Sequence, residues 1–282
     1  MDRTKPGGEK TDRKITEGLN TLSFHDGQLF YLYVPRRVIV EPRAARILVS
    51  VHGYTGSRSN ARGRAKVRKY AEYWIELAEK KGWVVLAPHF DERRFNRDYQ
   101  RLNPSGLRAD LRLNALVGEV GRRLPGIPTE NIFLFGFSGG GQFVHRYLTF
   151  SPERVHRAVC GAPGWYLWQD PSLPYPVGIA RKTLPYGLRP RWRELCGTKV
   201  LLIVGERDVA QRAFRRKYKG YDLMTLHGKG RKERAENWFT SLQNMANKKG
   251  WPFRMALKVL PRKGHVVNAL FLECATRYLC QP

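Results

Sequence analysis

The sequence predicts an α/β fold in which a mostly parallel central sheet carries helices on both faces and no large lid domain. Three observations predict it. Short apolar runs alternate with stretches of helical periodicity along almost the whole chain. The inner runs are apolar on both faces, as in parallel strands that are buried on both sides. A glycine-rich turn around Ser138 joins one of these runs to a helical stretch.

The individual elements follow in a regular order. Residues 28–34 alternate in polarity and are rich in aromatic side chains, which predicts an early antiparallel strand. Buried strands are predicted from short continuous apolar runs at 46–51 and 83–87. Further strands are predicted at 131–137, 155–162, 200–204 and 253–260. Helices are predicted from apolar side chains that recur every three or four positions, at 67–81, 107–124, 142–148, 232–248 and 266–279.

The chain has 282 residues and 42% hydrophobic content, enough to bury the core of one large α/β domain or of two small ones. Residues 1–17 are polar and predict a mobile leader, which leaves 18–282 as a single domain. Residues 163–197 interrupt the alternation and are rich in Pro, Trp, Tyr and Arg. We interpret them as an excursion over the active-site edge of the sheet and not as a second domain.

The termini and cysteines bear on the compartment. The first residues contain no apolar segment of a secretory signal, so a cytoplasmic protein is expected, although a mature secreted form would look the same. No apolar run approaches the ~20 residues that span a bilayer. The four cysteines match no zinc spacing. Free thiols are expected, with a Cys274–Cys280 pair as the alternative; the sequence indicates no oligomeric state.

Residues 136–140, Gly-Phe-Ser-Gly-Gly, form a G-x-S-x-G motif between a predicted strand and a predicted helix. A sharp strand-to-helix turn needs small neighbours and exposes the serine above the sheet. The N-terminus of the following helix offers N–H groups to an anion. The context predicts that Ser138 is a catalytic nucleophile; a glycine-rich turn with an idle serine is the alternative.

A serine hydroxyl needs a general base, and that base needs an orienting carboxylate. Asp208 follows the strand at 200–204, and Glu206 is the nearest alternative acid. His265 is the histidine that follows the last predicted strand. The competing histidines all come before the last predicted strand: His52, His89, His145, His156 and His227. We therefore predict a triad of Ser138, His265 and Asp208.

An oxyanion hole requires two N–H donors that point at the developing negative charge. The backbone N–H of Gly139, directly after the nucleophile, is one candidate. The other is the N–H of Tyr54 in the turn His52-Gly53-Tyr54, which ends an early strand. We expect His52 to brace this loop. An ordinary strand-ending turn is the alternative.

Together these pieces carry a family resemblance. The chain resembles the α/β-hydrolase superfamily of serine hydrolases over residues 20–280. The matching motifs are V-H-G-Y-T-G at 51–56, G-F-S-G-G at 136–140, G-E-R-D at 205–208 and G-H at 264–265. The compact layout looks most like the esterase, dienelactone-hydrolase and polyhydroxyalkanoate-depolymerase-like branches. The resemblance implies ester hydrolysis through an acyl-enzyme, with no metal and no organic cofactor. Dienelactone hydrolases carry a cysteine where this chain has Ser138, which argues against that activity.

The aromatic side chains of the excursion are candidates for substrate binding. Trp165, Tyr166 and Trp168 come directly after a strand that neighbours the elbow, so they could form an apolar wall for an acyl group. The alternative is that these rings pack back on the core. The sequence does not decide between the two.

The chain is strongly basic, with 51 Lys and Arg against 24 Asp and Glu and a net charge of +27. The first fourteen residues contribute only +2, so the charge belongs to the folded part. Basic side chains cluster after three strand ends: Arg58, Arg62, Arg64, Lys66, Arg68 and Lys69; Arg93, Arg94, Arg97 and Arg101; Arg212, Arg215, Arg216, Lys217 and Lys219. They suggest either a basic rim that favours anionic substrates or a solvated surface.

The expected activity is hydrolysis of a carboxylic ester, either a small molecule or a polymer. The alternatives are another acyl hydrolase on the same triad, a thioesterase or a peptidase, or a polyanion- or nucleic-acid-binding protein on a hydrolase fold. No nucleic-acid partner is expected, because no nucleic-acid-binding motif accompanies the charge.

Overall fold

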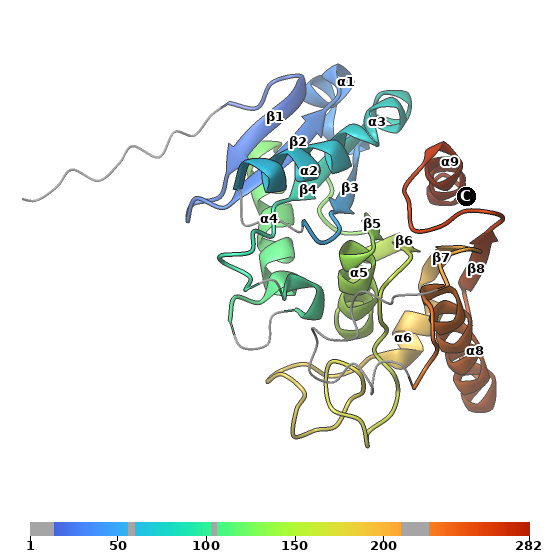
Figure 1. The fold of residues 1–282 in the computed structure, drawn as a ribbon. Helices are drawn as coiled ribbons and strands as arrows, with labels where there is room; N and C mark the ends of the chain where they lie inside the picture. Colours follow the sequence, from blue (N-terminus) through green and yellow to red (C-terminus); the bar gives the residue numbers. More distant parts are fainter. Residues whose placement is uncertain (1–13, 56–59, 97, 103–105, 210–225) are drawn as a thin grey trace, which may run out of the picture.

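A computed structural model describes residues 14–55, 60–96, 98–102, 106–209 and 226–282 of the chain. Its centre is an eight-stranded sheet with the order β1-β2-β4-β3-β5-β6-β7-β8 (Figure 1). The strands are β1 (Gly18–Ser23), β2 (Leu29–Val34), β3 (Arg46–Val51), β4 (Trp83–Pro88), β5 (Ile132–Phe137), β6 (Val155–Gly161), β7 (Lys199–Gly205) and β8 (Met255–Leu260). The fold prediction is confirmed.

The sheet is parallel from β4 to β8 and antiparallel at its N-terminal edge, where β2 pairs with both β1 and β4. Every residue of β4 and β5 is buried, which explains why these strands are apolar on both faces. The sequence analysis did not predict β1. Its sequence, GLNTLS, mixes polar and apolar side chains, and β1 is positioned by its antiparallel pairing with β2.

The helices are α1 (Arg36–Val40), α2 (Asn60–Glu72), α3 (Ile75–Lys81), α4 (Ala109–Arg123), α5 (Gly139–Phe150), α6 (Trp192–Gly197), α8 (Arg231–Lys249) and α9 (Ala269–Leu279). The predicted single helix at 67–81 is in fact two, α2 and α3, and α2 begins earlier. The break occurs at Trp74, whose buried indole donates a hydrogen bond to Ser50 Oγ (3.0 Å) and packs on Phe135. Anchoring this side chain in the core takes its backbone out of helical geometry.

Helices cover both faces of the sheet, as Figure 1 shows. The ring of Phe135 in β5 contacts Trp74, between α2 and α3, and Phe271 of α9, so these helices share one face. On the other face α5 packs against β5, with α4 on one side of it and α8 on the other. Tyr147 of α5 donates to Asn114 of α4 (2.6 Å), and His145 of α5 packs on a tryptophan of α8.

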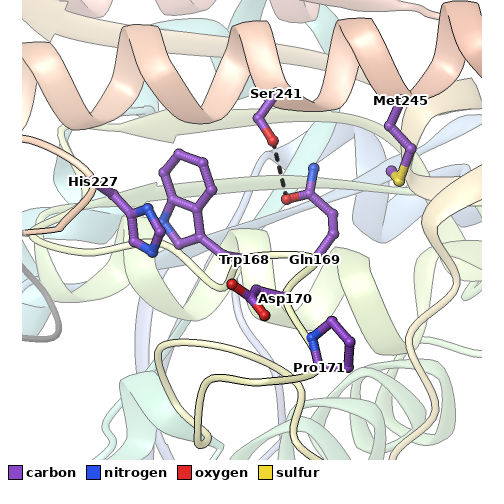
Figure 2. Close-up of a pocket in the computed structure, with 7 residues that line it drawn as sticks. All are labelled: Trp168, Gln169, Asp170, Pro171, His227, Ser241 and Met245. Atoms are coloured by element: carbon purple, nitrogen blue, oxygen red, sulfur yellow. Dashed lines mark hydrogen bonds between the residues drawn. The ribbon is translucent and has the colours of Figure 1, made fainter.

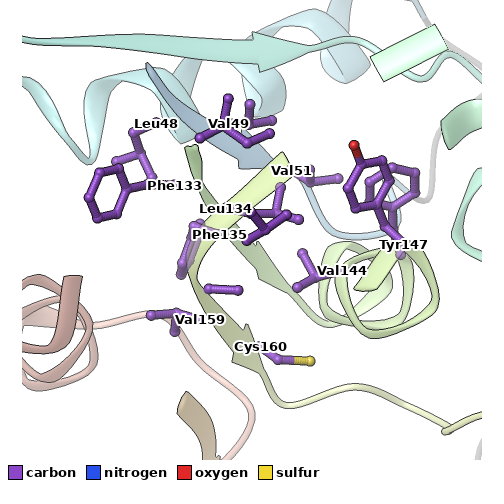
Figure 3. Close-up of a cluster of buried hydrophobic side chains, with 14 of the residues drawn as sticks. Leu48, Val49, Val51, Phe133, Leu134, Phe135, Val144, Tyr147, Val159 and Cys160 are labelled. Carbon is purple, nitrogen blue, oxygen red and sulfur yellow. The ribbon is translucent and has the colours of Figure 1, made fainter. Parts of the chain in front are cut away.

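In the core, α5 packs against β3, β5 and β6, the region shown in Figure 3. A Cβ atom on Gly136 would overlap the backbone of Gly140, and a Cβ on Gly140 would overlap the carbonyl oxygen of Val51. The glycines of the elbow therefore let α5 approach the sheet backbone to backbone. This contact fixes the position of the first turn of α5, where Ser138 begins the helix.

The excursion at 163–197 is hydrogen-bonded to α5 at three points, Leu167 to His145, Pro176 to Arg146 and Arg191 to Thr149. It therefore follows α5 from the second turn to the end of the helix. It also contains α6, which the sequence analysis did not predict. Of the predicted leader, residues 1–13 lie outside the described residues, and β1 begins at Gly18.

Candidate active site

The structure brings Ser138, His265 and Asp208 together, although 127 residues separate the serine from the histidine. His265 Nε2 lies 3.0 Å from Ser138 Oγ, and His265 Nδ1 lies 2.8 Å from Asp208 Oδ2. An ionised carboxylate can only accept, so Nδ1 carries the proton and Nε2 is left to accept from the serine hydroxyl. Each residue follows the carboxyl end of a strand: Ser138 follows β5, Asp208 follows β7 and His265 follows β8.

The elbow holds Ser138 in a strained conformation, with φ 58° and ψ −113°. Positive φ costs a non-glycine residue about 1–3 kcal/mol unless its surroundings impose it. Here they do: Ser138 N–H donates to Gly161 O (2.8 Å), and Ser138 O accepts from Gln142 N–H (3.0 Å). These hydrogen bonds of the turn offset the strain of the positive φ. The turn leaves the Ser138 hydroxyl at the carboxyl edge of the sheet.

The two candidate acids point in different directions. Asp208 is buried and faces His265. Glu206 is exposed, and its carboxylate accepts a hydrogen bond from the backbone N–H of Arg262 (2.6 Å). Glu206 thus holds the loop after β8, whereas Asp208 holds the imidazole.

The loop that carries His265 is fixed to the end of β7. Arg207 N–H donates to Lys263 O (2.8 Å), and a Cβ atom on Gly205 would overlap the backbone oxygens of this loop. The imidazole also packs on Phe137, with ring centres 4.7 Å apart. The strand ends therefore set the position of the histidine.

Arg231, the first residue of α8, also binds the acid, and the sequence analysis did not identify it. Its guanidinium donates to Asp208 Oδ1 at 2.8 Å. Burial alone would raise the pKa of Asp208, but the hydrogen bond from His265 and the charge of Arg231 outweigh it and hold that pKa below its ordinary value. The available signal was a basic residue at a helix N-terminus, where the helix dipole favours acidic ones.

His52 braces the predicted oxyanion loop. Its Nε2 accepts from Phe90 N–H (3.2 Å), so Nδ1 carries the proton and donates to Gly53 O (2.7 Å). Complete burial lowers the pKa of His52 to about 3, which keeps the ring neutral. The Gly53 carbonyl and the Tyr54 N–H belong to one peptide plane and point in opposite directions. Holding the carbonyl therefore aims the Tyr54 N–H, whose nitrogen lies 3.0 Å from the position of a Cβ built on Gly139.

Two further contacts hold this loop. Lys66 of α2 donates to Tyr54 O (2.5 Å), and the hydroxyl of buried Tyr99 donates to His52 O (2.6 Å). Tyr99 comes from the irregular region after β4, so no local pattern in the sequence pointed to it. The first turn of α5 contributes the Gly139 N–H, one of the four helix N-terminal N–H groups that have no partner within the helix.

The three aromatic candidates for substrate binding have different surroundings. Tyr166 is buried and stacks on Trp238 (4.7 Å), so its ring belongs to the core, the alternative left open above. Trp165 is also buried, beneath the guanidinium of Arg234. Trp168 is half-buried and stacks on His227, with ring centres 3.7 Å apart.

Trp168 and His227 line an open cavity of about 440 Å³ between the excursion and α8 (Figure 2). Gln169 also faces it, with its side-chain oxygen bound to Ser241 Oγ (3.2 Å). No triad residue lines this cavity. Of the three aromatic candidates, only Trp168 lines it.

The predicted basic rim is only partly covered by the described residues. Seven of its members lie outside them: Arg58, Arg97, Arg212, Arg215, Arg216, Lys217 and Lys219. Among the others, some are paired with acids: Arg68 with Glu72, Arg94 with Asp91, and Arg101 with Asp98. These pairs reduce the charge that the described part of the rim offers to a ligand.

Over the described parts of the chain, no group of three or more His, Cys, Asp or Glu side chains is arranged to hold a metal ion. None of the helices described there has the length and apolar character to cross a membrane. None of the four cysteines, all of them described, forms a disulfide in this structure.

The chain matches no family model, and no curated protein matches it in sequence. Solved structures do match. Poly(aspartic acid) hydrolase-1 from Sphingomonas sp. KT-1 has a TM-score of 0.75 at 21% identity, over 93% of this chain and 98% of that chain. A poly(3-hydroxybutyrate) depolymerase from Bordetella parapertussis has a TM-score of 0.71 at 25% identity, over 93% of this chain and 90% of that chain.

A third match, the siderophore hydrolase EstA from Aspergillus nidulans, has a TM-score of 0.54 at 15% identity, over 98% of this chain and 97% of that chain. All three matches extend over nearly the whole of both chains. The eight-stranded sheet, its order and its helices on both faces agree with that likeness. The chain therefore has the α/β-hydrolase fold.

Proposed function

We propose that the chain is a serine hydrolase that cleaves carboxylic esters through an acyl-enzyme. The observation that carries this proposal is the hydrogen-bonded series Asp208–His265–Ser138, with distances of 2.8 and 3.0 Å, at the head of a nucleophile elbow. The neighbouring structures, which include a depolymerase and other hydrolases, support a hydrolase. The ester substrate comes from the resemblance of the motifs and is part of the proposal.

In the acylation step, Ser138 Oγ attacks the carbonyl carbon of the ester while its proton passes to His265 Nε2. The carbonyl oxygen becomes an oxyanion, which the N–H groups of Tyr54 and Gly139 would hold. Asp208 stabilises the imidazolium without taking its proton. The tetrahedral intermediate then collapses, and the alcohol leaves with the proton from His265 Nε2.

The deacylation step repeats these roles with water. His265 Nε2 accepts a proton from a water molecule, whose oxygen attacks the acyl carbon on Ser138. Collapse of the second intermediate returns the proton from Nε2 to Ser138 Oγ and releases the carboxylic acid. The cycle needs no metal or organic cofactor, as the family resemblance implies.

The decisive test replaces the nucleophile. Ser138→Ala removes the attacking oxygen and should lower kcat toward p-nitrophenyl esters by about 10⁴-fold or more. The same change should abolish labelling by a fluorophosphonate, which reacts with activated serines whatever the natural substrate. Ser172→Ala is the matched control, because Ser172 is exposed in the excursion and its hydroxyl donates to Asp170 Oδ1 (2.6 Å), away from the triad. Ester turnover retained in Ser138→Ala would refute the assignment.

A second candidate, cleavage of an anionic polymer, is favoured by the charge of the chain. The neighbour with a TM-score of 0.75 hydrolyses poly(aspartic acid), which carries many carboxylates, and this chain has a net charge of +27. The same triad can cleave an amide bond. A polyester, the substrate type of the depolymerase neighbour, would instead be uncharged.

Salt dependence separates these substrates. Turnover would be measured for poly(aspartic acid), a poly(3-hydroxybutyrate) film and a pair of p-nitrophenyl esters that differ by one carboxylate. If the basic surface steers anionic substrates, kcat/KM for the anionic member should fall by about 10-fold or more between 20 and 500 mM salt, with little change for the neutral one. Equal salt dependence for both esters would rule out the anionic candidate.

A further inference from the structure

The carboxylate of Asp208 is shared between two donors, one on each oxygen. Oδ2 faces His265 Nδ1, and Oδ1 accepts from the guanidinium of Arg231, both at 2.8 Å. The side chains of Asp208 and Arg231 are only 3% and 11% exposed. Water screens such a pair little, so the charge of Arg231 acts strongly on the acid and on the imidazole behind it.

The start of α8 is fixed against the loop that carries the acid. Lys232 N–H donates to Asp208 O (3.2 Å), and a Cβ atom on Gly230 would overlap the carbonyl oxygen of Val209. The two backbones therefore touch on either side of Arg231. This packing holds the guanidinium in place even though a cation at a helix N-terminus is unfavourable for the helix dipole.

The other ionisable groups near Asp208 have defined roles. His265 comes from the loop after β8. Tyr166 comes from the loop after β6, and burial raises the pKa of its phenol well above the ordinary value, so Tyr166 stays neutral. Buried Arg234 of α8 binds the carbonyls of Gly164 and Gly228. On the acid's own loop, Glu206 and Arg207 are exposed to solvent. Among the described residues, Arg231 is the cation that bonds directly to the Asp208 carboxylate.

We propose that Arg231 is a positioning residue of the triad, which holds Asp208 ionised and oriented and thereby keeps the enzyme active at acid pH. This inference rests on the proposed function. A proton that binds to Asp208 weakens its bond with His265 Nδ1 and removes the negative charge that stabilises the imidazolium formed during the reaction. The positive charge of Arg231 opposes this protonation, so it moves the onset of activity to lower pH.

The test compares pH profiles of kcat/KM for a p-nitrophenyl ester, together with rates of fluorophosphonate labelling, between pH 4 and 9. Arg231→Gln removes the charge and Arg231→Lys retains it. The acid limb of the kcat/KM profile of Arg231→Gln should move to higher pH by about one unit. The loss of kcat/KM in this variant should be smaller at the alkaline plateau than at acid pH. The acid limb of Arg231→Lys should lie close to that of the native protein. Arg123→Gln is the matched control, because Arg123 pairs with Glu119 at 10% and 13% exposure, away from the triad.

Three results would overturn the inference: an acid limb that does not move in Arg231→Gln, an equal shift in Arg231→Lys, or a uniform loss at every pH in both variants. Thermal unfolding checks that each variant folds, and Arg231→Met, an uncharged side chain of similar length, replaces Gln if that variant does not fold. Failure of the proposed function has a different signature, because Ser138→Ala would then retain turnover.

Discussion

Several residues of the candidate site contact the backbone that carries a predicted catalytic group, and His52 is one of them. His52 is completely buried and neutral, and its Nδ1–H fixes the carbonyl of Gly53. The peptide that carries this carbonyl also carries the Tyr54 N–H, so the ring aims the proposed oxyanion donor. Its Nε2 serves another purpose, because it accepts from Phe90 N–H and ties the loop to the end of β4. The two nitrogens can therefore be tested separately.

His52→Asn and His52→Gln separate them. The side-chain amide of Asn can donate to Gly53 O from nearly the position of Nδ1, whereas Gln reaches the position of Nε2 and can accept from Phe90 N–H. If the orientation of the Tyr54 N–H matters, Gln should lower kcat for a p-nitrophenyl ester by about 100-fold, the typical cost of one oxyanion donor, with little change in KM. Asn should retain most of the activity.

Chemical denaturation supplies the control for this comparison, because both variants lose one buried hydrogen bond and about 1–3 kcal/mol of stability is expected in each. Rates are then compared at a temperature where both proteins are folded. Equal kcat values for Asn and Gln would show that His52 supports the loop without aiming the donor.

At the scale of elements, strands were more predictable than the helices and loops around them. A strand buried on both faces needs a continuous apolar run, and β4 and β5 have one. The break between α2 and α3 could not be predicted, because helical periodicity continues through Trp74 and only the contacts of its indole with Ser50 and Phe135 interrupt the helix. Tertiary contact overrides local pattern at this position.

The same distinction applies to the candidate site. Ser138, Asp208 and His265 each follow a strand, and the carboxyl ends of parallel strands meet at one edge, so strand order was sufficient to bring them together. Arg231 and Tyr99 reach the site through the packing of α8 and of the region after β4. The pattern of apolar and polar residues in the sequence does not indicate this packing, so Arg231 and Tyr99 could be found only in the structure.

At the scale of the whole molecule, five of the seven histidines resist protonation. Burial is the main cause that lowers the pKa of each of five: His52, His89, His145, His156 and His227. In the unfolded chain a histidine binds a proton near pH 6.5. Between that pH and the lower values of the folded state, the unfolded chain holds more protons than the folded protein, so acid favours unfolding.

Stability should therefore fall as the pH is lowered from about 6.5, by about 1.4 kcal/mol per pH unit for each proton that only the unfolded state binds. His145 offers the cleanest test, because it is buried and its Nε2 accepts from Leu167 N–H (2.9 Å). Gln at this position can accept the same hydrogen bond but does not titrate. Urea unfolding between pH 7 and 4.5, above the range where Asp208 takes up its proton, should give a shallower dependence for His145→Gln than for the native protein. Equal slopes would mean that the unfolded and folded states bind the same number of protons at this residue, and that the burial of His145 does not contribute to acid destabilisation.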